Sequence, residues 1–102
     1  MTDRELLELA AKAAGYILGA HSIHAHKVCL GGVEWNPLTD DGDALRLASD
    51  LSINTYWMES GRVHCFHADT NGPPCIESGR EDRLANYRRA ITRAAVDIGR
   101  AL

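Results

Sequence analysis

No hydrophobic run in this chain approaches the roughly 20 residues that a helix needs to cross a bilayer, which argues against a membrane protein. The first five residues, MTDRE, carry acidic side chains where a secretory signal peptide has a basic start, so export is not expected. The three cysteines, Cys29, Cys65 and Cys75, are an odd number. An odd count without an export signal argues against a disulfide framework and predicts reduced thiols in a cytosol.

Recognisable catalytic motifs are also missing. The chain has no Gly-x-Ser-x-Gly turn, no Walker loop and no dinucleotide-binding fingerprint. His64 and Cys65 are neighbours, but adjacent residues of a strand point to opposite sides and do not form a nucleophile with its base. None of the 14 acidic residues stands out as a general acid or base. We therefore expect a protein that is not an enzyme and that holds no cofactor.

The composition is that of one soluble globular domain. The chain has 102 residues, of which 45% are hydrophobic and 25% are charged. Because this length is typical of a single domain, residues 1–102 are predicted to share one core.

Three segments have the three- and four-residue apolar spacing of amphipathic helices: 2–18, 40–51 and 79–102. Capping residues open each of them: Thr2 with Glu5, Thr39 or Asp40, and Ser78 with Glu81. Gly19 is predicted to end the first helix, whose apolar face is expected to include Ile17.

The segments between these helices have patterns typical of strands and turns. Alternating character predicts a strand within residues 23–30 and a second, short strand at 33–35. Residues 53–67 are predicted to form a β-hairpin, and residues 69–79, which include two prolines, a loop. Together these elements predict an α+β fold. It is expected to be a compact α/β sandwich of three helices packed on a small, mainly antiparallel sheet of three or four strands.

The net charge of −3 is unevenly distributed. Residues 1–60 have a net charge of −5, and residues 61–102 have a net charge of +2, in which every basic residue is an arginine. Arg89, Arg93 and Arg100, the arginine stripe, share a face of the last helix and could hold a phosphate or a partner's carboxylates. A solvated helix face is the alternative. Because the whole chain is acidic, nucleic acid is not expected as a partner.

Asp40, Asp41 and Asp43 cluster around the start of the second helix. A calcium loop needs a glutamate at its twelfth position, where Leu51 stands, so calcium is rejected. The three carboxylates are expected to complement the positive end of the helix. Contact with a cationic partner is the alternative.

Histidines and cysteines form two clusters, at residues 21–29 and 64–75. His24 and His26 would point to one side of a strand, and a thiolate from Cys65 or Cys75 could join them in a tetrahedral zinc site. The chain has no Cys-x-x-Cys motif, so we favour ordinary surface histidines and small buried thiols over a metal site.

Aromatic residues of the predicted hairpin are the first candidates for partner binding. The candidate residues are Tyr56, Trp57, His64, Phe66 and His67, followed by Arg89 and Arg93 of the arginine stripe. The two tryptophans, Trp35 and Trp57, also suit the core or the rim of a sheet.

Residues 35–48, WNPLTDDGDALRLA, resemble small bacteriophage and prophage proteins that are grouped as the phage α-β-α (ABA) sandwich domain. The opening residues 2–10 and the last helix, residues 88–102, are also similar to these proteins. The resemblance implies a viral origin and an α/β sandwich. It transfers no activity and no catalytic or binding residue.

These observations lead to three hypotheses. The first is a non-enzymatic phage accessory protein that binds a host protein in the cytoplasm of a bacterial host, in counter-defence of the anti-CRISPR kind. The second is a sponge that sequesters a nucleotide immune signal, tested at Trp35 and Arg93. The third is a zinc-stabilised binding module. The last helix could also pair with its copy in a homodimer if Ala90, Ala94 and Ala101 face outward.

Overall fold

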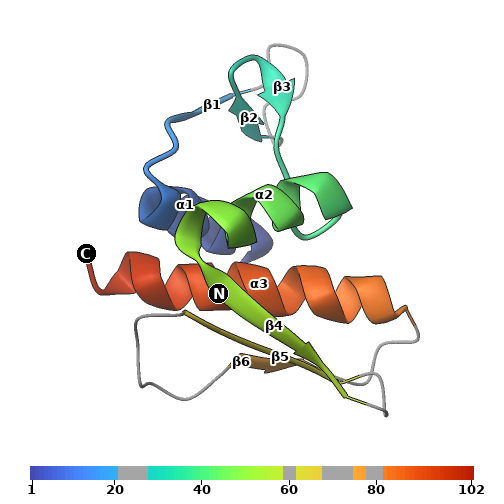
Figure 1. Ribbon diagram of the computed structural model, residues 1–102. Coiled ribbons are helices and arrows are strands. Elements are labelled where there is room, and N and C mark those ends of the chain that lie inside the picture. The colour runs from blue at the N-terminus through green and yellow to red at the C-terminus, as the bar shows by residue number, and fades with distance from the viewer. Residues whose placement is uncertain (21–27, 59–61, 68–74, 78–81) are drawn as a thin grey trace.

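The computed structural model describes residues 1–20, 28–58, 62–67, 75–77 and 82–102. The elements in chain order are α1 (Asp3–Ala14), β1 (Leu18–Ala20), β2 (Val28–Leu30), β3 (Val33–Glu34), α2 (Asp41–Leu51), β4 (Ile53–Trp57), β5 (Val63–His67), β6 (Cys75–Glu77) and α3 (Arg83–Arg100). The predicted α+β class with three helices is confirmed (Figure 1). No helix in the described ranges is both long and apolar enough to cross a membrane.

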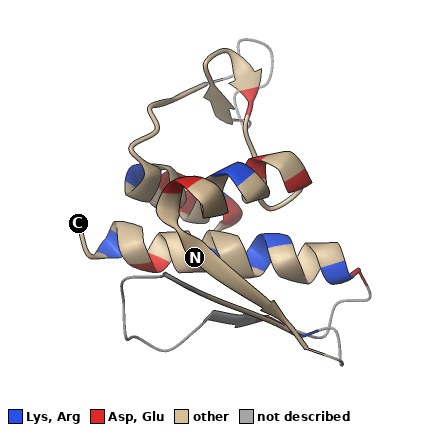
Figure 2. Ribbon diagram, in the orientation of Figure 1, with Lys and Arg blue, Asp and Glu red and all other residues tan. Residues whose placement is uncertain are grey.

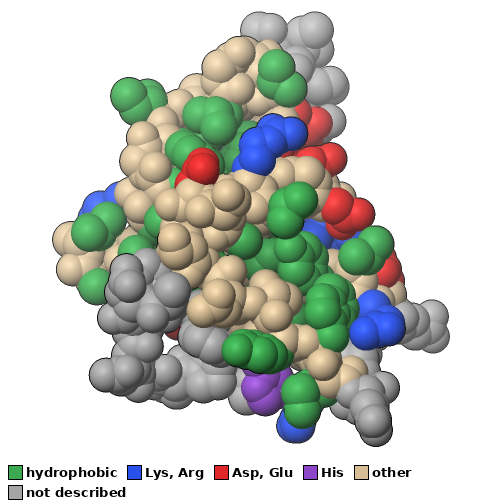
Figure 3. Space-filling model, in the orientation of Figure 1, with side chains coloured by type: hydrophobic (Ala, Val, Ile, Leu, Met, Phe, Trp, Pro, Cys, Tyr) green, Lys and Arg blue, Asp and Glu red, His purple; other side chains and the backbone are tan. Residues whose placement is uncertain are grey.

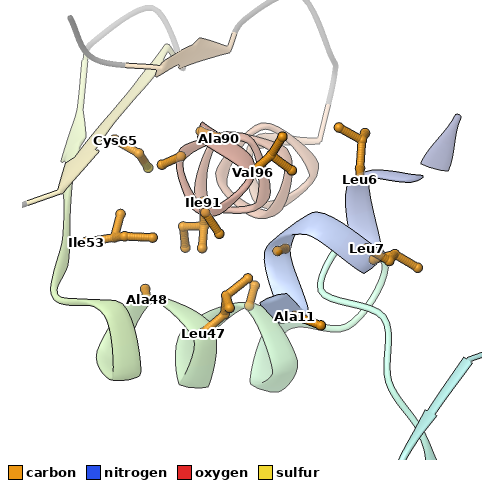
Figure 4. Packing of buried hydrophobic residues seen from close by; sticks show 14 of the residues in the cluster. Leu6, Leu7, Ala11, Leu47, Ala48, Ile53, Cys65, Ala90, Ile91 and Val96 are labelled. Carbon is orange, nitrogen blue, oxygen red and sulfur yellow. The ribbon is translucent and has the colours of Figure 1, made fainter. Parts of the chain in front are cut away.

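The central element of the fold is α3. Helices α1 and α2 pack on one side of it, and the strands β4, β5 and β6 cover the other (Figure 1). Figure 4 looks along α3, with Leu47 and Ile53 close to Ile91 and with Cys65 beside Ala90 on the sheet side. Because both sides of α3 are covered, its buried residues surround the helix: Asn86, Ala90, Ile91, Thr92, Ala94, Ala95, Val96 and Gly99.

The residues of α3 that are buried differ from those that its apolar spacing predicts. Leu84 and Leu102, at the two ends of the predicted stripe, are 45% and 69% exposed. Ala90 and Ala94, which a homodimer through this helix needs on the outside, are instead in the core. A homodimer through the last helix requires these two alanines to face outward, and they do not.

Side-chain caps begin α1 and α2 as the sequence predicts. The backbone N–H of Glu5 donates to Oγ1 of Thr2 at 3.2 Å, and that of Asp43 donates to Oδ2 of Asp40 at 2.8 Å. The carboxylate of Asp43 accepts from the backbone N–H of Asn36 at 3.0 Å. The acidic residues therefore stabilise the start of α2, as expected.

The start of α3 differs from the prediction. Its cap is Asp82, whose Oδ1 accepts from the backbone N–H of Leu84 at 2.9 Å. Because the helix begins at Arg83, the predicted start at residue 79 is wrong. The predicted capping pair, Ser78 and Glu81, lies outside the described residues.

Helix α1 ends earlier than predicted, at Gly15 instead of Gly19. Gly15 has a φ of 75°, in the left-handed region that favours glycine, and its N–H bonds to carbonyls of the last turn. Gly19 lies in β1. Ile17 is therefore beyond the helix and 89% exposed, so the prediction that it is buried is wrong.

The strands form two three-stranded sheets, in the orders β1-β2-β3 and β4-β5-β6, where the sequence predicts a single sheet. All the pairings are antiparallel, as expected. The predicted hairpin is confirmed, since β4 pairs with β5 from Ile53–His67 to Trp57–Val63. The strands β1 and β6 are not predicted, and β6 lies within the predicted loop; each has three residues, too few for an alternating pattern.

Trp35 attaches the sheet β1-β2-β3 to the helices. It follows β3, is 3% exposed, and packs edge-on against Tyr16 with 5.7 Å between ring centroids. Its backbone N–H donates to the carbonyl of Val28 in β2 at 3.0 Å. Trp35 is therefore a core residue, which is one of the two roles that the sequence predicts for it.

Candidate functional site

Trp57, the last residue of β4, lies against α3. Its indole stacks on the ring of Tyr87 with 5.3 Å between the ring centroids and an interplanar angle of 15°. The guanidinium carbon of Arg83 lies 4.9 Å from the centroid of the same indole, within the range of a cation–π contact. Arg83 and Tyr87 are four residues apart on α3, so the helix places both side chains at Trp57.

An open hollow of about 520 Å³ adjoins this contact, and the described residues that line it are Trp57, Arg83 and Leu84. Trp57 is 42% exposed, although tryptophan is among the side chains that folding buries most on average. In Figure 3, hydrophobic side chains gather over the face that carries α2 and β4. Trp57, Arg83, Leu84 and Tyr87 are together named the Trp57 surface.

Arg83 supplies the positive charge of the Trp57 surface. Among the described residues, no carboxylate lies within ion-pair distance of its guanidinium. Burial raises the pKa of Tyr87, and the nearby Cys65 and Asp41 add to this effect. The Tyr87 hydroxyl therefore stays neutral at physiological pH, and the Trp57 surface is apolar with one cation at its margin.

Basic residues are spread along α3 (Figure 2). Two of its other arginines, Arg88 and Arg93, are paired with acids inside the molecule. Arg88 donates to the carbonyl of Leu38 at 2.9 Å and to Oδ1 of Asp41 at 2.7 Å. Its side chain is only 14% exposed and also lies 3.6 Å from Oδ2 of Asp82. Arg88 thus fastens the start of α2 to α3.

Glu77 of β6 holds two arginines that the sequence makes candidates for partner binding. Nη1 of Arg93 lies 2.8 Å from Oε1 of Glu77, and Nε of Arg89 lies 3.7 Å from the same oxygen. The Glu77 side chain is 11% exposed, and Arg89 also approaches Asp3 of α1 at 3.7 Å. These two residues of the arginine stripe therefore tie β6 and α1 to α3, which leaves less of their charge for an external phosphate.

Of the other hairpin candidates, Tyr56 and His64 have described side chains, and neither joins the Trp57 surface. Tyr56 precedes Trp57 in β4 and points to the opposite face of the sheet, where it is 57% exposed and lies opposite His64 of β5. Nε2 of His64 is buried without a hydrogen-bond partner among the described residues. Phe66 and His67 belong to β5, and their side chains lie outside the described part of the chain.

The zinc candidates are only partly described. His24 and His26 lie outside the described residues. Cys65 is buried, its Sγ lies 3.7 Å from Oγ1 of Thr55, and burial raises the pKa of its thiol to about 11. At neutral pH the sulfur is therefore a thiol, whereas zinc and nucleophilic chemistry need the thiolate. Cys75 lies opposite Cys65 in β6, with its side chain outside the described part.

In the ranges that the structure describes, no three His, Cys, Asp or Glu residues come together as metal ligands would. A zinc site formed with His24 and His26 stays a prediction.

Arg83, Leu84 and Tyr87 were not predicted as site residues. Leu84 and Tyr87 fit the apolar spacing of the last helix, which assigns them to its buried stripe. The four-residue spacing of Arg83 and Tyr87 is visible in the sequence. This spacing alone does not reveal the Trp57 surface, because the surface also depends on β4 placing Trp57 beside α3.

Comparisons with models of protein families, with curated proteins and with solved structures find no match to this chain.

Proposed function

We propose that the chain is a non-enzymatic binding protein that contacts a protein partner through the Trp57 surface. The observation that carries this proposal is the partly exposed stack of Trp57 on Tyr87, with Arg83 over the indole. Tryptophan, tyrosine and arginine are the residue types that most often dominate the free energy of protein interfaces.

The chemistry of the hollow indicates what it accepts. Trp57 and Leu84 offer apolar area, so an apolar side chain of the partner gains free energy by leaving water there. Arg83, which has no carboxylate partner among the described residues, can pair with an acidic group of the partner at the margin. The surface therefore suits a segment with an acidic residue beside an apolar one.

The resemblance of residues 35–48 to phage ABA sandwich proteins supports a phage origin and, with it, a bacterial protein as the partner. The segments that carry the resemblance, residues 2–10, 35–48 and 88–102, include no residue of the Trp57 surface. We assign them to the scaffold and the Trp57 surface to the function grafted on it. Counter-defence in the cytoplasm of the host, of the anti-CRISPR kind, is the role that we propose.

A nucleotide sponge has less support from the geometry. Trp35 is 3% exposed and packed against Tyr16, so it offers no face on which a base can stack. Arg93, the second residue proposed for such a site, is paired with Glu77. Calorimetric titration with cyclic nucleotides tests this alternative, since a sponge gives saturable heat near one ligand per chain or per pair of chains.

Capture from a bacterial lysate tests the proposed function. The tagged wild type is compared with Trp57→Ala and with Val33→Ala, a control at an exposed apolar residue of the other sheet. We expect one protein to be retained in stoichiometric amount by the wild type and by Val33→Ala. Loss of a central tryptophan typically costs roughly 2 kcal/mol or more, so Trp57→Ala should bind roughly 30-fold more weakly.

Circular dichroism of the three proteins shows whether each is folded. Equal retention by folded Trp57→Ala and by the wild type would overturn the assignment of the surface. Repeated failure of the wild type to retain any protein would overturn the function.

A further inference from the structure

The outer edge of β4 is open among the described residues. In the sheet order β4-β5-β6, β4 pairs only with β5, over all five of its residues. The backbone N–H of Met58 donates to the carbonyl of Arg62 at 2.8 Å, which sets the alternation of the ladder. The backbone groups of Ile53, Thr55 and Trp57 therefore point away from β5, toward the open edge.

This edge lacks the features with which proteins protect exposed strands. Such strands are usually very short, or carry a proline, a charged residue or a bulge. The sequence of β4, INTYW, has no proline and no charge, and its register with β5 is unbroken. The other edge strands are shorter, with three residues in β6 and β1 and two in β3, and Glu77 adds a charge to β6. An unprotected edge of this length is a template for another strand.

We propose that this strand is β4 of a second copy of the chain, paired antiparallel about a two-fold axis at Thr55. In this register Thr55 lies opposite Thr55 of the second copy, and edge-facing residues meet edge-facing residues, as a ladder requires. Ile53 lies opposite Trp57 of the second copy, a β-branched residue against an aromatic one. Such pairs and threonine pairs are favourable between strands. The register uses the whole of β4 and joins two three-stranded sheets into one of six strands.

Charge at the two ends of β4 supports the antiparallel arrangement. Trp57 ends the strand beside the Arg83 guanidinium. Ile53 begins the strand directly after α2, whose C-terminal end carries the negative end of the helix dipole and has no basic residue in its last turn. Antiparallel pairing places the positive end of one copy beside the negative end of the other, twice. Parallel pairing places like charges together.

The dimer also bears on the proposed binding site, and this step rests on the proposed function. Each hollow at Trp57 comes to lie next to the α2–β4 junction of the other copy, which supplies a further wall. Two hollows, related by the two-fold axis, then face a partner from one assembly. A five-residue strand pair is small compared with the roughly 1,200 Å² of a stable interface, so the dimer is expected to dissociate on dilution.

Sedimentation velocity over a concentration series tests the dimer. We expect the wild type to change from monomer to dimer as its concentration rises. Thr55→Pro removes the edge-facing N–H from both copies without removing a bond of the β4–β5 ladder, and should weaken the dimer roughly tenfold. A wild type that remains a monomer up to millimolar concentration overturns the proposal, as does a dimer that folded Thr55→Pro leaves unchanged.

Cysteine pairing tests the register independently, should Thr55→Pro fail to fold. Asn54 lies opposite Tyr56 of the second copy, and both are exposed. Under mild oxidation, a mixture of Asn54→Cys and Tyr56→Cys chains should give covalent dimers several-fold faster than either variant alone. Equal rates in all three samples overturn the two-fold register.

The lysate capture separates this inference from the proposed function. A monomeric protein that still retains its partner through Trp57 overturns the dimer and leaves the function standing. A dimer that retains no partner from the lysate overturns the proposed function and leaves the dimer standing.

Discussion

Tyr16 connects the chain that leaves α1 with two other parts of the molecule. Its ring packs on Trp35, and its hydroxyl donates to Oδ2 of Asp50 near the end of α2. Burial, followed by the hydrogen bond to the negatively charged Asp50, raises the pKa of Tyr16 to about 12. The hydroxyl proton of Tyr16 makes the hydrogen bond to α2, and the ring of Tyr16 contacts Trp35 next to the sheet β1-β2-β3. Loss of this proton therefore weakens the attachment of that sheet to the helices.

Tyr16 should contribute to the stability of the fold against alkali. An unfolded tyrosine has a pKa near 10, so between about pH 10 and about pH 12 the unfolded chain loses this proton before the folded protein does. The free energy of unfolding contributed by Tyr16 is complete below pH 10 and is lost as the pH rises through this window. As the pH rises through this window, the free energy of unfolding of Tyr16→Phe should fall by on the order of 1 kcal/mol less than that of the wild type.

Urea denaturation of both proteins at about pH 9 and about pH 11 measures the effect. Cys65, whose pKa burial raises to about 11, contributes a similar fall in both proteins, so the difference between them isolates Tyr16. Equal losses of stability in the two proteins would contradict the account.

Among the elements, α1 and α3 make an unusually close contact at Gly99. A Cβ atom at this position would lie 2.2 Å from the carbonyl oxygen of Leu9 and 3.0 Å from its carbonyl carbon. These are backbone atoms of α1, so they cannot move aside as the end of a flexible side chain can. The absence of a side chain at Gly99 therefore sets the distance between the two helices.

Gly99→Ala should destabilise the fold. Alanine favours a helix over glycine by about 1 kcal/mol, but forcing α1 away from α3 typically costs about 1–3 kcal/mol and opens the core around it. We expect a net loss of up to about 2 kcal/mol in the free energy of unfolding, measured by urea denaturation.

The matched control is Gly42→Ala in α2. There the added atom would meet only side-chain ends, Oδ2 of Asp40 at 3.3 Å and Nη2 of Arg46 at 3.5 Å. This variant should keep wild-type stability within about 0.5 kcal/mol or gain slightly. If Gly99→Ala is as stable as Gly42→Ala, the close packing of α1 on α3 is wrong.

How far the elements could be predicted depends on their length. The three helices and the β4–β5 hairpin repeat a local pattern over many residues, so periodicity and the caps at Thr2 and Asp40 locate them within a few positions. The strands β1 and β6 have three residues and owe their form to partners elsewhere in the chain. Ile17 was misjudged for a related reason, since its spacing fits a helix that Gly15 has already ended.

At the scale of the whole molecule, the sequence could not show that α3 is enclosed. Periodicity predicts one apolar face, but Asn86 and Thr92 are as buried as Ile91, because sheet and helices cover α3 from both sides. The same arrangement brings the residues of the Trp57 surface together. The residue type of Trp57 makes it a candidate, whereas Arg83 and Leu84 are candidates only because β4 lies beside α3.

The arginines of α3 differ in what they contact. Arg88, Arg89 and Arg93 are bonded to acids of α1, α2 and β6, and these ion pairs connect the layers. Arg83 stands apart, with its guanidinium over Trp57. Arg88, Arg89 and Arg93 of α3 thus hold the layers together, whereas Arg83 lies at the surface that we propose for binding.

Amide hydrogen exchange of the protein alone and in complex with the captured partner locates the surface that binds. We expect slower exchange on binding at the end of β4 and in the first two turns of α3, with β2 and β3 unchanged. Protection confined to α1 or to the sheet β1-β2-β3, with none around Trp57, would contradict this expectation.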